Sequence, residues 1–595
     1  MRTLFANFKF FVDFFRGNDI MGMLIKTIGK ILREGDKPMS FDKLKYSSEK
    51  NTVIKKFLVP QRIVACNDTD KENMLLCDTP RQSAPRAENC TTVRRGGYVL
   101  LDFGCEFQGG IDLTVQVSIP RSRIRIVFGE SVSEALSSIG VKNATNNHSV
   151  RDMIVETCSM SSMRYGNTGF RFVKIEPIDN DILIRGVKGV FEYKDLEYKG
   201  SFECSDALLN TIWNTAAYTV HLNMQDYIWD GIKRDRLVWI GDMHPEVSTI
   251  TSVFGYDASV EKSLDYIRDE TPLNRDFAHD DDACWMNTLP SYTLWWIKIH
   301  RDWYYQNGSK EYLNQQKDYM YAAAKLILPR IHDDGSLDFP SYFVDWSSKD
   351  TPAEEPGFRG CLVLSLRAAA EIFAVYDDAG MSKKCLDKIG CVAKALPDFS
   401  TNKQMAAIVS LAGLADSKAV SDGVIKKDLL QGLSTFYGYY VLHALAKSGD
   451  TQAAIDVMRG FWGAMLRFGA TTFWEDFDIR WIENAAPIDD IVPEGKADIH
   501  GDYGKFCYTQ LRHSLCHGWA SGPAPFMTKH ILGVGIAEPG CRKLIITPHL
   551  GDLEWVRGTY PTPYGTVTIE HRKENGKIVS KIDVPDEITV EVNNG

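Results

Sequence analysis

The spacing of the hydrophobic residues changes twice along this chain, and these changes limit the folds it can adopt. From about residue 53 to 193, apolar and polar residues alternate, as in IDLTVQVSI at 111–119. A period of two is typical of a half-buried antiparallel strand, with one apolar and one polar face. Between about 205 and 532 the period becomes that of an α-helix, and after 539 the alternation returns. The sequence therefore predicts a β region, an α region and a second β region.

The α region begins with SDALLNTIWNTAAYTV, in which Ser205 is the expected N-cap of a helix. Further on, Gly449-Asp450-Thr451 is expected to end one helix and to start the next. Such helix pairs recur without a fixed sequence repeat, which favours a closed α/α barrel over a regular solenoid. The apolar stripe of the first helix comprises Leu208, Leu209, Ile212, Trp213, Ala216 and Val220.

Four segments follow from these patterns. Residues 1–50 form an N-terminal leader, and residues 51–198, with short strands between Gly-rich turns, form an N-terminal β-sandwich. Residues 199–535 form the α/α barrel, and residues 536–595 a small C-terminal β-domain in which Asn575-Gly576 is a hairpin turn.

The charge balance and the cysteines restrict partners and compartment. With 68 Lys+Arg against 78 Asp+Glu, the net charge of −10 argues against nucleic acid as a partner. The 13 cysteines are an odd number without CxxC pairs, so free thiols in a reducing compartment are expected. The apolar N-terminus is interrupted by Lys9 and Asp13 and lacks a signal-peptide cleavage site, which predicts a cytoplasmic protein whose start is Met1, Met21 or Met23. No membrane partner is expected.

The stretch DGIKRDRLVWIGD, at 230–242, places several charges beside apolar residues. If the segment is helical, Asp235, Trp239, Asp242 and Glu246 fall on one face. An aromatic ring beside carboxylates suits a sugar, which has an apolar face and a hydroxylated rim. The alternative is a surface network in which the neighbouring arginines neutralise the aspartates.

A second cluster, GATTFWEDFD, places Trp474, Glu475 and Asp476 in a loop after Gly469. Helix-end loops of helical barrels are places where sites collect, although solvated loop charges are an equally good interpretation. Three further stretches combine a tryptophan with an acid or a histidine, and each tryptophan could instead belong to the core: HDDDACW ending at Trp285, SYFVDW ending at Asp345-Trp346, and HSLCHGW containing His517 and Trp519.

Metal and cofactor motifs are missing from the sequence. His513, Cys516 and His517 lack a second ligand pair, and the Asp280–Asp282 run lacks the ligand spacing of a calcium loop, so it is expected to be a solvated turn. No GxSxG, Walker or dinucleotide fingerprint occurs. Neither a metal nor a cofactor is expected.

From about residue 50 onward, the chain resembles the α-L-rhamnosidases of glycoside hydrolase family 78. DGIKRDRLVWIGD resembles the family motif of an Asp, an Arg, an acid followed by Arg-Leu, and Trp-x-Gly-Asp. LLDFGCEFQGG, FGESVSEA and GNTGFRFVKIE resemble the upstream β-domain, and TTFWEDFD and SLCHGWASGPAPF resemble later parts of the barrel. The resemblance implies a six-hairpin α/α toroid flanked by β-sandwich domains.

The resemblance also implies an inverting glycosidase that removes terminal α-L-rhamnose. Asp235 matches the general acid and Glu475 the general base. Asp235 stands where a Glu is usual, and Val238 where a Gly is usual. The candidate sugar-binding residues are Asp230, Arg234, Trp239, Asp242, Trp285, Asp345, Trp346, Trp474 and His517.

Two other functions stay open. A related glycosidase or lyase could act on another deoxy sugar or a uronic acid, and Lys233 with Arg234 is the local hint of a basic pocket for a carboxylate. A non-catalytic glycan-binding protein would keep the pocket without the chemistry. In each case a carbohydrate is the expected partner, and a homodimer is left open.

Overall fold

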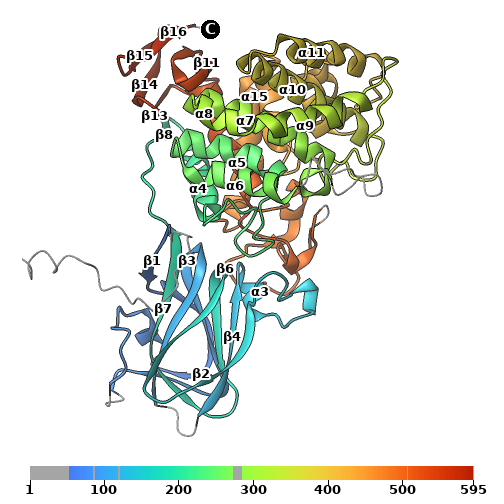
Figure 1. The fold of residues 1–595 in the computed structure, drawn as a ribbon. Helices are drawn as coiled ribbons and strands as arrows, with labels where there is room; N and C mark the ends of the chain where they lie inside the picture. The colour runs from blue at the N-terminus through green and yellow to red at the C-terminus, as the bar shows by residue number, and fades with distance from the viewer. Residues whose placement is uncertain (1–51, 85–87, 118–120, 272–283, 505–506, 594–595) are drawn as a thin grey trace, which may run out of the picture. The chain divides into compact units, whose positions relative to one another are not determined.

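The computed structural model describes residues 52–84, 88–117, 121–271, 284–504 and 507–593 (Figure 1). The leader at 1–50, with the alternative starts Met21 and Met23, and the Asp280–Asp282 turn lie outside these ranges.

The first described region is a seven-stranded antiparallel sheet. The strand order is β1-β7-β3-β6-β4-β5, and β2 pairs with β3. Its core contains Phe107, Phe128 and Phe170, whose rings lie 4.3 Å (107 to 170) and 4.7 Å (128 to 170) apart. The strands are β1 (Val53–Leu58), β2 (Arg62–Asp70), β3 (Thr91–Val117), β4 (Ser122–Gly129), β5 (Asp152–Thr157), β6 (Ser161–Pro177) and β7 (Ile182–Lys194).

The part of the alternating stretch that the structure describes, 111–117, lies in β3, but its polar face is covered. Asp112 is buried and binds Arg81 at 2.6 Å and Arg164 at 2.9 Å. Ser83 Oγ and the Gln116 amide oxygen lie 3.4 Å apart. The prediction of a half-buried strand was wrong because Arg81 and Ser83 come from a segment that packs on the polar face.

The helical region forms a closed cycle of contacts. Helix α5 packs on α7, α7 on α10, α10 on α12, α12 on α14, α14 on α17, and α17 returns to α5. Helices α6, α11 and α15 pack on α5, α10 and α14 respectively, as the second members of helix pairs. The helices are α4 (Ala207–Asn223), α5 (Ile240–Val253), α6 (Ala258–Glu270), α7 (Pro290–Asn307), α8 (Lys310–Gln315), α9 (Lys317–Ile327), α10 (Glu354–Val375), α11 (Ala379–Lys394), α12 (Lys403–Leu411), α13 (Ser417–Val420), α14 (Gly438–Lys447), α15 (Thr451–Val457), α16 (Gly463–Arg467), α17 (Pro523–Phe526) and the π-turn η11 (Met527–Ile531).

Two local predictions for this region need correction. The N-cap of α4 is Asp206, not Ser205, because the Asp206 carboxylate accepts the backbone N–H groups of Leu208 and Leu209. The segment 235–239 is not helical, since α5 begins at Ile240 after Trp239 as N-cap. The predicted face with Asp235 and Trp239 on one helix was therefore wrong. The break after α14 is confirmed, with Asp450 as the N-cap of α15.

The second β region holds two sheets. One has the order β11-β12-β16 and the other β15-β14-β13-β8, so a strand that precedes α4 in the chain completes the second sheet. The predicted Asn575-Gly576 turn joins β14 to β15, and both residues have positive φ. The strands are β8 (Ser201–Cys204), β11 (Val534–Glu538), β12 (Lys543–Ile546), β13 (Trp555–Thr562), β14 (Gly565–Glu574), β15 (Lys577–Asp583) and β16 (Thr589–Val592).

All 13 cysteines lie within the described ranges and none of them is joined in a disulfide, as expected from the sequence. Within the same ranges, every helix is too short or too polar to span a lipid bilayer.

Candidate active site

A buried carboxylate shapes the loop before α5. The oxygens of Asp230 accept the backbone N–H groups of Asp235 at 3.1 Å and Leu237 at 2.9 Å. Gly518 N donates to the Asp230 carbonyl at 2.8 Å, which ties the loop to the 514–519 segment. Burial raises the pKa of Asp230 to about 7, and the Asp242 carboxylate adds to the rise. Asp230 thus fixes the backbone that carries Asp235.

The Arg234 guanidinium lies at the centre of the site. Its Nη2 donates to Oε2 of Glu475, and its Nη1 lies 3.3 Å from Oδ1 of Asp235. Its Nε donates to the Arg512 carbonyl at 2.7 Å, and the Tyr508 ring lies 3.5 Å from its Cζ. One buried cation therefore contacts both candidate catalytic carboxylates.

Glu475 lies in a non-helical loop, where both its side chain and its backbone carbonyl accept hydrogen bonds. The Ser514 N–H donates to its Oε2 at 2.7 Å, and Trp519 Nε1 donates to its carbonyl at 3.0 Å. Burial opposes ionisation of this carboxyl, but the Arg234 cation outweighs that effect and holds its pKa well below the usual range. Glu475 is therefore an ionised carboxylate, as a general base must be.

Asp235 is the most accessible of these acids. Its side chain is 12% exposed, against 1% for Glu475. His148 Nε2, from the segment between β4 and β5, lies 3.1 Å from Asp235 Oδ1. This access suits a group that must meet the leaving oxygen of a substrate.

Asp242, in the first turn of α5, pairs with His517. The His517 Nε2 lies 3.3 Å from Asp242 Oδ2, and the Tyr292 hydroxyl donates to Asp242 Oδ1 at 3.3 Å. Gly241 is required here, because a Cβ would lie 2.3 Å from the Tyr292 ring. Although burial opposes protonation, the Glu475 and Asp242 carboxylates raise the pKa of His517. The His517 Nδ1 is buried without a hydrogen-bond partner in the described structure, so it can donate to a ligand.

Asp345 belongs to the same end of the helices. Its carboxylate accepts hydrogen bonds from the Ser347 hydroxyl and, at 3.0 Å, from the Ser434 hydroxyl. The next residue, Thr435, donates to the Glu475 carbonyl at 2.5 Å. Burial raises the pKa of Asp345 to about 6. A two-residue segment therefore connects Asp345 with Glu475.

The four candidate tryptophans differ in environment. Trp239 is half-buried and meets the Tyr292 ring edge-on at 6.1 Å. Trp346 is also half-buried, beside Phe343. Trp285 and Trp474 are fully buried, and in the described structure neither indole N–H has a partner. The Trp285 ring packs on Phe339, with the ring centroids 5.8 Å apart.

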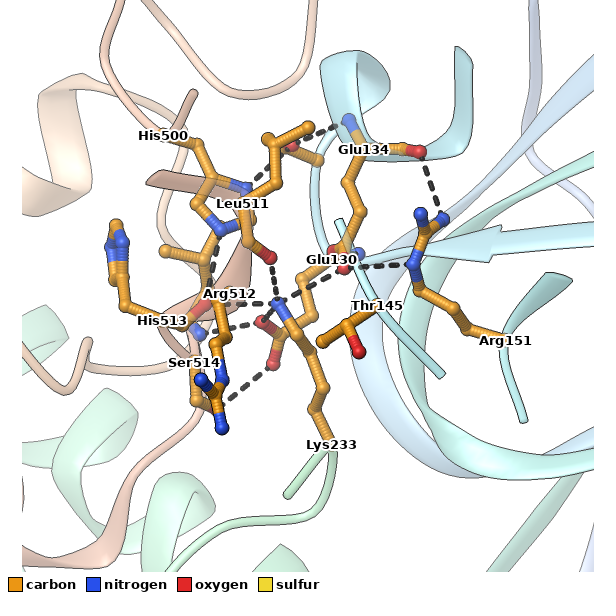
Figure 2. A network of polar contacts seen from close by, with 12 residues as sticks. Glu130, Glu134, Thr145, Arg151, Lys233, His500, Leu511, Arg512, His513 and Ser514 are labelled. Atoms are coloured by element: carbon orange, nitrogen blue, oxygen red, sulfur yellow. Dashed lines mark hydrogen bonds and ion pairs between the residues drawn. The ribbon is translucent and has the colours of Figure 1, made fainter. Parts of the chain in front are cut away.

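Lys233 is buried in a polar network (Figure 2). Its Nζ donates to the carbonyls of Leu511 at 2.8 Å and His513 at 2.9 Å. The Lys233 Nζ also lies 3.1 Å from Glu130 Oε2 and 3.0 Å from Glu134 Oε1. Glu134 belongs to the short helix α3 (Val132–Leu136), and Glu130 precedes that helix.

Glu130, Glu134 and His500 form a group close enough to hold a metal ion. The Lys233 ammonium already supplies positive charge between the two glutamates, and the Ser131 hydroxyl and the His513 carbonyl contact the His500 ring. The group fits a buried lysine with its acceptors better than a metal centre.

Glu130 also connects the β-sheet region to the general-base candidate. Its Oε2 accepts the Leu515 N–H at 2.7 Å, and the Ser514 hydroxyl donates to its Oε1 at 3.1 Å. Ser514 is the residue whose N–H binds Glu475. A carboxylate of the sheet region thus fixes the segment that orients Glu475.

Sequence reasoning missed several residues of this site: His148, Glu130, Glu134, Tyr292, Tyr508, Arg512 and Ser514. His148, Glu130 and Glu134 come from the first β region, and none lies in a motif with a chemical signature. The one available signal was FGESVSEA, which contains both glutamates.

Two segments match known domain families. Residues 197–360 match the bacterial alpha-L-rhamnosidase 6 hairpin glycosidase domain, and residues 533–593 match the bacterial alpha-L-rhamnosidase C-terminal domain. The chain resembles the bacterial α-L-rhamnosidases. A curated α-L-rhamnosidase from Formosa agariphila is 32% identical over 81 residues, which cover 14% of this chain and 8% of the relative.

Solved rhamnosidases share the fold. The family 78 rhamnosidase of Bacillus sp. GL1 has a TM-score of 0.70 and 22% identity, over 87% of this chain and 55% of that chain. The α-L-rhamnosidase from Dictyoglumus thermophilum has a TM-score of 0.67 and 20% identity, over 92% and 59%. The Klebsiella oxytoca rhamnosidase, solved with rhamnose bound, has a TM-score of 0.61 and 18% identity, over 80% and 96%. The chain thus spans little more than half of the first two rhamnosidases.

Proposed function

We propose that this chain is an inverting glycoside hydrolase that removes terminal α-L-rhamnose from oligosaccharides or glycosides. The observation that carries the proposal is the Arg234 guanidinium, which contacts Glu475 and Asp235 with different nitrogens. Two carboxylates facing one buried cation, one ionised and buried, the other accessible, suit the division of work in glycoside hydrolysis.

In this mechanism Glu475 removes a proton from a water molecule as that water attacks the anomeric carbon. Asp235 delivers a proton to the glycosidic oxygen on the opposite side of the sugar. The depressed pKa of Glu475 supports the base role, because the carboxylate stays ionised at neutral pH. The accessibility of Asp235 supports the acid role.

In this proposal the sugar is bound by hydrogen-bonding groups and an aromatic ring that are available to a ligand. The His517 Nδ1 and the half-buried Trp239 ring offer a donor and an aromatic face. Asp242 and Asp345 offer acceptors for sugar hydroxyls. The rhamnosidases from Streptomyces avermitilis and Klebsiella oxytoca, solved with rhamnose, support this sugar over others.

We also retain the architectural expectations: an α/α toroid over 199–535, a β-sandwich over 51–198 and a small β-domain over 536–595. The cycle of helix contacts supports the toroid. A cytoplasmic location and a homodimer stay predictions.

The lyase alternative loses its local hint. Lys233 is buried among the acceptors of Figure 2, so it is not free to bind a substrate carboxylate. A related glycosidase that acts on another deoxy sugar or a uronic acid, and a non-catalytic glycan-binding protein, are the remaining alternatives. Release of p-nitrophenol from p-nitrophenyl α-L-rhamnoside supports hydrolysis, whereas rhamnose binding by calorimetry without any release supports the binding protein.

A further inference from the structure

A cavity of about 420 Å³ lies among the helices, away from the candidate active site. Helix α5 contributes to both places: Asp242 lies in its first turn, while Ser248 and Ser252 line the cavity. Ten residues of α-helix separate Asp242 from Ser252, which is about 15 Å. Helices α7 and α14, the π-turn η11 and strands β11 and β13 supply most of the remaining wall.

The charged groups on this wall do not balance. Lys298 and Arg301 both contact Asp302, and Arg301 also binds Glu371 at 2.7 Å. The positive charges of Lys298 and Arg301 are therefore matched by the carboxylates of Asp302 and Glu371. Lys529 is a further cation of the wall, and in the described structure its ammonium makes no hydrogen bond or ion pair.

Lys529 is crowded by other positive charge even though its side chain is accessible. Burial lowers the pKa of its ammonium, and the nearby Lys298 lowers it further. The Lys529 side chain is nevertheless exposed to solvent. The ammonium thus lies on the wall of an open cavity, close to Lys298, where an anion can reach it.

The neutral groups of the wall suit hydroxyls. His443 is buried, its Nδ1 and the His530 Nε2 lie 2.8 Å apart, and its Nε2 has no partner in the described structure. Burial holds the pKa of His443 well below its usual value, so it adds no charge. Aromatic rings and small hydroxyls surround these groups: Tyr305, Tyr439, Tyr440, Tyr560, Ser248 and Thr251.

We propose that this cavity binds a small polyhydroxylated anion, a monosaccharide bearing a carboxylate or a phosphate, with its charged group on Lys529. A volume of about 420 Å³ is within the range of small-molecule sites. An ammonium without a partner supplies a charge-assisted hydrogen bond, and the His443 ring and the tyrosine hydroxyls meet the sugar. The proposal is independent of the rhamnosidase activity.

Calorimetry of the full chain tests the proposal with D-galacturonate, D-glucose 6-phosphate, D-galactose and inorganic phosphate as probes. We expect saturable binding of at least one anionic sugar, and the probe that binds distinguishes carboxylate from phosphate. Lys529→Met should weaken that binding at least about tenfold, because it removes the charge-assisted contact. Lys325→Met, at an exposed lysine of α9, should bind like the wild type.

Separate outcomes overturn each part. No binding of either anionic sugar, or equal binding by wild type and Lys529→Met, overturns the site. Equal affinity for inorganic phosphate and glucose 6-phosphate overturns the role of the hydroxyl-binding wall. Loss of anionic-sugar binding in Glu475→Gln would place the ligand in the active site and also overturn the proposal. Thermal melting checks that Lys529→Met is folded, and if it is not, Lys529→Gln takes its place.

Discussion

Arg234 and Glu475 form a buried ion pair in which Nη2 of the arginine and the Ser514 N–H share the same carboxylate oxygen, Oε2. Both side chains are 1% exposed. The pair joins the loop before α5 to the loop that carries Glu475. Breaking this ion pair should therefore change both the stability of the fold and the activity.

Removing the cation should change the acid side of the pH profile. Arg234→Met leaves Glu475 buried without its main counter-charge, so its depressed pKa should rise and the acid limb of kcat/KM should move to higher pH. In the wild type, the stability from this pair is present above the unfolded carboxyl pKa of about 4.3 and is lost as pH falls through the lower folded pKa. Arg234→Met should also cost about 3–5 kcal/mol of unfolding free energy.

Arg234→Lys keeps the charge and is the matched control, with a smaller shift of the limb. An acid limb that stays in place in Arg234→Met would show that Glu475 is not the group that titrates.

The His517–Asp242 pair should be visible in a histidine titration. The folded pKa of His517 is raised, so its contribution to stability is complete below the unfolded value of about 6.5 and is lost as pH rises through the folded pKa. Asp242→Asn should lower the pKa of His517, as followed by NMR of the imidazole. Tyr292→Phe, which leaves the carboxylate in place, should change it less. A wild-type His517 that titrates below about 6.5 would contradict this pairing.

Glu130 should act on turnover through Ser514 and Leu515. Glu130→Gln removes the charge that fixes these residues, and misplacement of Glu475 should lower kcat by about 10- to 100-fold, with a smaller change in KM. Glu134→Gln is the matched control, because Glu134 also contacts Lys233 but makes no bond to Ser514 or Leu515 in the described structure. Equal losses of kcat in the two variants would reduce Glu130 to a purely structural role.

Trp239 and Trp285 should separate sugar binding from core packing. Trp239→Ala should lower kcat/KM by one to two orders of magnitude, about 1–3 kcal/mol, with little change in melting temperature. Trp285→Ala, at a fully buried ring, should instead cost about 3–5 kcal/mol of unfolding free energy. A large drop in melting temperature with intact kinetics in Trp239→Ala would assign that ring to the core.

The β, α, β order could be predicted because hydrophobic periodicity reports which face of an element is buried. The loop 235–239 could not, since the Asp230 carboxylate binds the backbone N–H groups of Asp235 and Leu237 and replaces helical hydrogen bonds there. The polar face of β3 was misjudged for a related reason: partners far away in the sequence cover it.

The carboxylates and His517 of the site could be proposed from their motifs. Their supports could not, because Lys233 meets Glu130 and Glu134 only through tertiary packing of the sheet region on the 511–515 segment. Lys233, which the sequence suggested as part of a basic pocket, instead connects the sheet region to the 511–515 segment.

The roles of Asp235 and Glu475 should separate with leaving-group quality. Asp235→Asn should impair hydrolysis of rhamnosyl disaccharides more than that of p-nitrophenyl rhamnoside, because a good leaving group needs less protonation. Glu475→Gln should slow both, since water activation is common to them. Steady-state kcat/KM for both substrates checks this, and an equal effect of Asp235→Asn on the two would move the acid role to another carboxylate.

The stereochemistry of the product tests the central claim most directly. ¹H NMR of the first turnovers on p-nitrophenyl α-L-rhamnoside, recorded before mutarotation, identifies the anomer that is released. Attack by a water activated at Glu475, opposite to Asp235, predicts β-L-rhamnose as the first product. Release of α-L-rhamnose first would mean a retaining reaction through a covalent intermediate and would contradict the role of Glu475 as a general base.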